Sequence, residues 1–165
     1  MSISIKILDK NTLPAVLQVV TRSFSTVAEE FGLTRENCPE HTAFVQLDDL
    51  ERDYENGYQM FGLYTAEQLA SFASLSSLGD GVYQINRLST LPPYRHRGYG
   101  RILLKHCEEA AAMLGAASVE VTIIDENTRL KNWYLRQGFV PVRVEQIDGL
   151  PCTVGHLAKN LKDAR

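Results

Sequence analysis

Apolar and polar residues recur with two different periods along this chain, and these periods mark its expected strands and helices. Over residues 3–7, isoleucine alternates with serine and lysine, which is typical of a half-buried strand. Between Val16 and Phe31, large apolar residues recur at helical spacing, with Pro14 near the start and Gly32 directly after the last of them. The pattern therefore predicts a first strand followed by a helix that ends at Phe31.

The remaining periodicities predict the order βααβββαβαββ. We expect a second helix after His41 or Thr42, further helices over 102–114 and 127–137, and strands at 58–65, 68–78, 82–91, 117–124, 139–146 and 152–157. On the helix over 102–114, the inward stripe is expected to hold Ile102, Leu103, His106, Cys107, Ala110 and Leu114. A helical crossover joins strands 82–91 and 117–124, so these two should run parallel. The fold class is then α/β (or α+β), a mixed sheet with helices on both faces.

Composition and charge narrow the functional classes. The chain has 165 residues, 44% of them hydrophobic and 22% charged, which suits a single domain over 1–165 with its own core. A net charge of −3 argues against a general nucleic-acid binder. Three widely spaced cysteines without a C-x-x-C suggest neither a disulfide framework nor a zinc site, and no metal is expected. Without a signal peptide or a long apolar run, we expect a cytoplasmic protein with no membrane partner.

Positive charge concentrates around the predicted start of the helix over 102–114. No Asp or Glu occurs from Gly81 to Cys107. A helix N-terminus has unpaired N–H groups and a partial positive charge, so arginines there are unfavourable unless an anion joins them. The segment therefore predicts a bound phosphate, held by N–H groups that glycine leaves accessible, although a solvated basic helix end is the alternative. Its cations are Arg87, Arg95, Arg97, Arg101 and Lys105.

Two motifs in this part of the chain resemble a known family. Residues 95–100, Arg-His-Arg-Gly-Tyr-Gly, resemble the Q/R-x-x-G-x-G/A signature of the GCN5-related N-acetyltransferase (GNAT) family. Residues 127–139 resemble the N-(x)6-Y-(x)3-G-F pattern that relatives carry on the helix after the central strand. With the preceding strand, the resemblance covers residues 82–139. It implies a mostly antiparallel sheet whose central parallel pair splays apart, and acetyl-coenzyme A as co-substrate.

The resemblance also implies roles for individual residues. Asn127 would contact the pantetheine arm of coenzyme A, although capping the helix is an alternative role for it. Tyr134 would protonate the leaving thiolate and contact the co-substrate, unless it is only a core aromatic residue. The arm would pair as a pseudo-strand with Leu88, Ser89 and Thr90. The pyrophosphate would be bound by Arg95, His96, Arg97, Gly98, Tyr99, Gly100 and Arg101.

The general base and the acceptor stay open at this point. Glu120 alternates away from its apolar neighbours and is a candidate base that could face the site, but it is equally a candidate surface residue. His41 is a second candidate, and a water relay would need neither. For the acceptor, the connecting loop offers Asn37, His41 and Thr42. Residues 29–55 hold nine acidic residues, which form either a solvated face or a rim that attracts a cationic amine.

The function predicted from these patterns is acetyl transfer from acetyl-coenzyme A to a primary amine on a small molecule or a protein, and the family implies a possible homodimer. A non-catalytic acyl-coenzyme A sensor of the same fold is the alternative. A dinucleotide-binding motif does not fit, because Leu103 occupies the position of the third glycine. A nucleotide P-loop does not fit either, because no Gly-Lys-Ser/Thr occurs.

Overall fold

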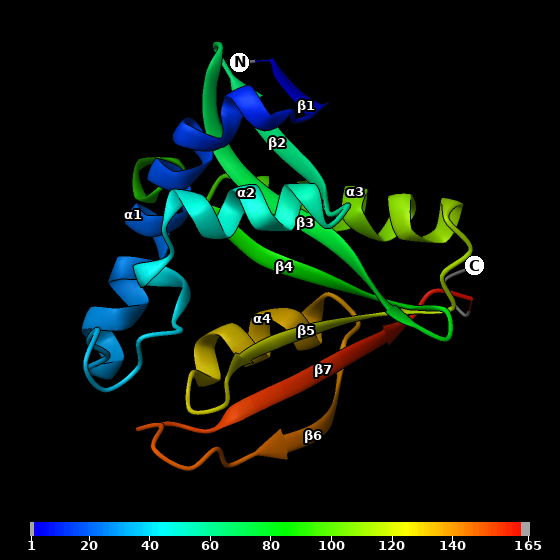
Figure 1. Cartoon of the computed structure of the whole chain (residues 1–165). Coiled ribbons are helices and arrows are strands. Elements are labelled where there is room, and N and C mark those ends of the chain that lie inside the picture. Colours follow the sequence, from blue (N-terminus) through cyan, green and yellow to red (C-terminus); the bar gives the residue numbers. More distant parts are fainter. Residues whose placement is uncertain (1, 163–165) are drawn as a thin grey trace.

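A computed structural model describes residues 2–162, and its centre is a seven-stranded sheet in the order β1-β2-β3-β4-β5-β7-β6 (Figure 1). The strands are β1 (Ile3–Ile7), β2 (Gln59–Thr65), β3 (Gln68–Gly79), β4 (Val82–Thr90), β5 (Ser118–Ile124), β6 (Val140–Glu145) and β7 (Val154–Asn160). The α-helices are α1 (Leu13–Phe31), α2 (Leu47–Glu55), α3 (Tyr99–Met113) and α4 (Thr128–Arg136). Short 3-10 turns occupy Lys10–Thr12, Thr42–Phe44 and Pro92–Tyr94. The predicted order of strands and α-helices is confirmed.

All neighbouring strands are antiparallel except β4 and β5, which are parallel. Their pairing covers only Val82↔Ser118, Tyr83↔Val119 and Gln84↔Glu120. Beyond these residues the two strands diverge, and the far half of β4 has β3 as its neighbour on one side alone (Figure 1). The predicted mixed, mostly antiparallel sheet with a splayed central parallel pair is confirmed.

The two faces of the sheet carry separate hydrophobic cores. On one face Met60 and Phe72 pack with Val20 of α1 and Leu50 of α2. On the other face, residues such as Phe61 and Ala73 pack with the apolar residues of α3 and α4. Because successive residues of a strand point to opposite faces, Met60 and Phe61 belong to different cores. Helices therefore cover both faces, as predicted.

The connection between α1 and α2 differs in detail from the prediction. Helix α1 ends where expected, at Gly32, whose positive φ of 65° and N–H bonds to Ala28 and Glu29 close the last turn. The second helix does not begin after His41, because Val45 has extended backbone. Helix α2 begins after Gln46, whose N–H donates to the Asp49 carboxylate in a capping box.

The buried face of α3 is also rotated from the predicted stripe. Leu103, Leu104 and Cys107 are fully buried, whereas Ile102 is 39% exposed and Leu114 is 48% exposed. The prediction for Ile102 was wrong because the three consecutive apolar residues 102–104 leave the phase of the helix undetermined, and that for Leu114 was wrong because this residue is the C-cap, beyond the end of α3. In the part of the chain that the structure describes, none of the helices is long and apolar enough to cross a membrane.

Candidate active site

A cleft of about 740 Å³ opens where β4 and β5 diverge. Its walls come from the far half of β4, the end of β5, the loop before α3, and helices α1, α2 and α4. In open α/β sheets, ligands bind in crevices at the carboxyl ends of strands, and an unpaired strand edge can accept an extended peptide-like chain. The cleft therefore offers both a groove and exposed backbone groups to a ligand.

The N-terminus of α3 opens into this cleft. Gly98 is the N-cap, has a left-handed conformation with φ 81°, and provides no side chain to cap the first turn. The first-turn N–H groups therefore have no side-chain acceptor on the cap residue, and the helix dipole favours an anion beside them. Gly98, Tyr99, Gly100 and Arg101 all line the cleft. This geometry fits a diphosphate.

The cations of the loop have different surroundings. Arg95 lines the cleft, but its Nη2 donates to the Ser23 carbonyl oxygen at 3.0 Å and to Thr26 Oγ1 at 3.2 Å, which ties the loop to α1. Burial lowers the pKa of Arg95. Arg97 is exposed, lies over the Tyr94 ring at 5.5 Å and is not among the residues that line the cleft. His96 and Arg101 do line it.

The predicted pantetheine strip also lies in the cleft. Leu88, Ser89 and Thr90 line the wall that β4 provides. Among the described residues, Ser89 Oγ is buried without a hydrogen-bond partner. Asn127 lines the cleft as well, and its Oδ1 accepts the N–H of Leu130 at 3.2 Å. The capping role of Asn127 is therefore present, and its side chain is near enough to the cleft for a second role.

Tyr134, on α4, also lines this cleft. Its side chain is 5% exposed and packs edge-on against Trp133 and Phe139, with ring centroids 5.0 and 5.3 Å away. Burial raises the pKa of the Tyr134 hydroxyl, so the phenol keeps its proton across the physiological range. Tyr134 is thus a core aromatic residue with a protonated hydroxyl, and it also lines the cleft.

The candidate bases lie outside the lining of the cleft. Glu120 points to the face opposite Val119 and Val121, and its Oε1 is 3.9 Å from Arg143 Nη1 on β6. His41 lies at ring-centroid distances of 6.0 Å from Phe24 and 6.1 Å from Phe44, and its Nδ1 accepts the N–H of Ala43. Burial lowers the pKa of His41. The structure therefore provides no geometric support for either residue as the base.

Two of the three residues predicted to contact the acceptor amine also lie outside the lining of the cleft. Asn37 closes a turn, because its side chain accepts the N–H of Thr34 and donates to the carbonyl oxygen of Gly32. Neither Asn37 nor His41 is among the residues that line the cleft, whereas Thr42 is.

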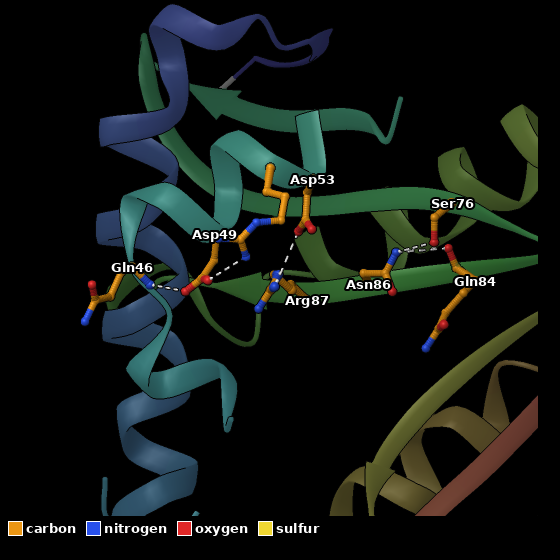
Figure 2. Close-up of polar contacts among 8 residues, drawn as sticks. Gln46, Asp49, Asp53, Ser76, Gln84, Asn86 and Arg87 are labelled. Carbon is orange, nitrogen blue, oxygen red and sulfur yellow. Dashed lines mark hydrogen bonds and ion pairs between the residues drawn. The ribbon is translucent and has the colours of Figure 1, made fainter. Parts of the chain in front are cut away.

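The sequence did not indicate an ion pair that joins β4 to α2 in the cleft. Arg87 Nη2 lies 3.3 Å from Asp53 Oδ2 (Figure 2), and both residues line the cleft. Arg87 has a positive φ of 55°, a conformation that costs a non-glycine residue about 1–3 kcal/mol. The sequence showed a cation within the strand, but it carried no signal that α2 would place Asp53 opposite it. Trp133, Thr122 and Glu30 are further lining residues that the motifs did not single out.

Residues 23–139 match the family model described as Acetyltransferase (GNAT) family, and the chain belongs to this family. The match includes both motifs and the whole of the splayed strand pair. Among curated protein sequences, none matches this chain.

Solved structures share the fold at low sequence identity. The ribosomal-protein-S18-alanine N-acetyltransferase from Escherichia coli is 17% identical, with a TM-score of 0.78 over 97% of this chain and 94% of that chain. The PaiA N-acetyltransferase from Thermoplasma acidophilum, solved in complex with coenzyme A, is 22% identical, with a TM-score of 0.72 over 97% and 99% of the two chains. The putative acetyltransferase YncA from Salmonella typhimurium, solved with its cofactor acetyl-CoA, is 17% identical, with a TM-score of 0.71 over 98% and 95%.

Proposed function

We propose that this protein transfers an acetyl group from acetyl-coenzyme A to a primary amine. The observation that carries the proposal is a single cleft that contains the uncapped N-terminus of α3, the unpaired half of β4 and the protonated Tyr134. Two relatives of the same fold were solved with coenzyme A or acetyl-CoA, and membership of an acetyltransferase family supports acyl transfer as the class of reaction.

The residues of the cleft fit such a co-substrate. The backbone N–H groups from Gly98 to Arg101 bind its diphosphate, and the Arg101 guanidinium adds a charge-assisted donor. Backbone groups of residues 88–90, on the unpaired half of β4, pair with the pantetheine arm. When bound, acetyl-coenzyme A would supply an activated thioester.

The residues of the chain then perform three tasks. A backbone N–H of residues 88–90 donates to the carbonyl oxygen as the neutral amine attacks and negative charge develops there. The new C–N bond forms as the C–S bond breaks, and Tyr134 donates its proton to the departing sulfur. The proton that the amine loses passes to water and returns through water to Tyr134, which balances the reaction. Because Glu120 and His41 lie outside the lining of the cleft, we assign the proton relay to water.

The proposal is tested by measuring thiol release from acetyl-coenzyme A over a panel of amines. Replacing Tyr134 with Phe should lower the turnover number about 100-fold or more, because general acid catalysis contributes that much, and should change coenzyme A affinity by less than about two-fold. Tyr83→Phe is the matched control, because Tyr83 packs against the same core and does not line the cleft. Binding of coenzyme A without turnover of any amine would instead identify a sensor.

A further inference from the structure

The Arg87–Asp53 pair is built into the cleft by an irregularity in β4. Phe72 pairs with Ser89 and Ser74 pairs with Asn86, so the single residue Ala73 lies opposite both Arg87 and Leu88. Such a β-bulge re-aims a side chain and is common beside active sites. Here it turns Arg87 toward α2, where its guanidinium meets Asp53 (Figure 2).

The surroundings of the bulge hold Arg87 in place. Asn86 Nδ2 donates to Ser76 Oγ at 2.9 Å on the neighbouring strand, which anchors the residue directly before Arg87 (Figure 2). Asp53 belongs to α2, whose Leu50 is fully buried in the core below it. The strained conformation of Arg87 is therefore supported from both the sheet and the helix.

The pair leaves most of its hydrogen-bonding capacity unused. A guanidinium has five N–H donors in a planar fork, and one of them reaches Asp53 at 3.3 Å. The two side chains are 21% and 16% exposed, so water reaches them poorly. Burial also raises the pKa of Asp53, and the neighbouring Arg87 guanidinium opposes this effect. A carboxylate on a ligand would accept hydrogen bonds from the remaining N–H groups of the Arg87 guanidinium.

From these observations we infer that the acceptor carries a carboxylate beside its amine, as an amino acid does, and that Arg87 binds this carboxylate. The inference rests on the proposed function and specifies its acceptor. Arg87 directly precedes residues 88–90, so a carboxylate held there leaves an α-amine only a few bonds from the strand that borders the reacting thioester. The protonated α-amine of the incoming amino acid then lies near the Asp53 carboxylate. The charges of Arg87, Asp53 and the zwitterionic amino acid sum to zero.

Electrostatics disfavours a polycationic acceptor. The Arg87 guanidinium disfavours a ligand with several positive charges, and several acidic residues of the segment over 29–55 already have partners. Glu30 pairs with Arg129 at 2.7 Å, Asp49 with Arg52 at 3.3 Å and Glu55 with Lys10 at 2.9 Å. The acidic segment over 29–55 is thus partly neutralised by the fold, which weakens the alternative in which it forms a rim that attracts a cationic amine.

The test compares the twenty amino acids with their carboxamides and with spermidine as acceptors. For the best amino acid, kcat/KM should exceed that of its carboxamide about 10- to 100-fold, which corresponds to one or two hydrogen bonds to a charged group. Arg87→Gln should raise KM for the amino acid by about the same factor and leave the carboxamide unchanged. Arg87→Lys keeps the charge but loses the fork, so its effect should be intermediate.

Two controls separate binding from folding. Arg52→Gln removes an exposed arginine of α2 that does not line the cleft, and it should behave as the parent protein does. Arg87→Gln leaves the half-buried Asp53 carboxylate without its partner. The double variant Arg87→Gln with Asp53→Asn therefore serves as a control in which both residues are neutral. Thermal melting checks that each variant folds.

Calorimetric titration of the amino acid, with and without saturating coenzyme A, gives a readout that does not depend on turnover. Turnover of amines regardless of a carboxylate, with Arg87→Gln silent, overturns the inference and leaves the transferase proposal standing. Arg87-dependent binding of an amino acid without turnover supports the inference and overturns the transferase proposal. An absence of both binding and turnover overturns both.

Discussion

At the scale of single residues, the two glycines of the loop before α3 have different physical tasks. Gly98 has φ 81°, and a Cβ there would meet no atom within 4 Å, so its requirement is purely conformational. Gly100 lies in the first turn of α3, and a Cβ there would meet Thr90 Oγ1 at 3.6 Å and Trp133 Cζ2 at 3.9 Å, which are ordinary contacts. The two positions should therefore respond oppositely to the same substitution.

Gly98→Ala should lower the free energy of unfolding by about 1 kcal/mol and weaken coenzyme A binding, because alanine resists the left-handed conformation that aims the N–H groups. Gly100→Ala should be neutral or stabilising by up to about 1 kcal/mol, because alanine is the better helix former, and should retain the ligand. Denaturant titration and calorimetry measure the two effects. Equal losses of affinity in both variants would contradict this distinction.

His41 provides a pH-dependent prediction at the same scale. Burial lowers its pKa from an ordinary value near 6.5, so below that value the unfolded chain takes up a proton that the folded chain resists. The contribution of neutral His41 is fully present above pH 6.5 and is lost as the pH falls from this value through the lower pKa of the folded state. His41→Asn can still accept the N–H of Ala43 but does not titrate.

Between pH 7.5 and 5.5, chosen to lie about one unit on either side of the unperturbed pKa, the parent protein should therefore lose more free energy of unfolding than His41→Asn does. Denaturant titrations at the two pH values provide the comparison. The other histidines are common to both proteins and cancel in the difference. Parallel losses in the two proteins would show that His41 is not the group responsible.

At the scale of elements, periodicity predicted which segments are helices and strands because each amphipathic face must be buried. Periodicity did not predict the burial of single residues where burial depends on the position of the strand in the sheet. Ile7 alternates like a core residue, yet it is 75% exposed because β1 is an edge strand. The motifs similarly predicted the loop and Tyr134, whereas Asp53 and Arg87 depend on a bulge and on the packing of α2 over β4. Such tertiary relations leave no local pattern in the sequence.

The β2–β3 hairpin yields a prediction at this scale. Thr65 pairs with Gln68, so Ala66 and Glu67 form a two-residue turn, and both have positive φ, 48° and 65°. Such a type I′ turn prefers Asn-Gly. The double variant Ala66→Asn with Glu67→Gly should add about 1–2 kcal/mol to the free energy of unfolding without changing activity, since neither residue lines the cleft.

Thermal melting should show this gain as a rise of about 2–8 °C for a chain of this length. Glu67→Pro is the opposite control, because proline is restricted to negative φ and should destabilise the hairpin by more than that amount. An Asn-Gly variant that melts below the parent protein would show that the turn is not of this type.

At the scale of the whole molecule, the sheet consists of two antiparallel parts joined by one short parallel contact. The part formed by β1 to β4 meets the part formed by β5, β7 and β6 through three residue pairs, and beyond them the cleft separates the strands. The opening that creates the binding site thus removes hydrogen bonds from the centre of the sheet. A ligand that pairs with residues 88–90 would restore part of that lost connection.

Coenzyme A should therefore stabilise the fold and protect a specific strand segment. At a concentration of about 100 times its Kd, a ligand that binds only the folded state adds about 2.7 kcal/mol, or roughly 5–10 °C in Tm for this size. In hydrogen exchange, amides within residues 88–90 should slow markedly, while those of β2, which pairs on both sides, should change little. Acetyl-pantetheine, which lacks the diphosphate, should protect the same segment more weakly. Protection confined to other strands would show that the arm does not lie along β4, and the mechanism built on residues 88–90 would then be wrong.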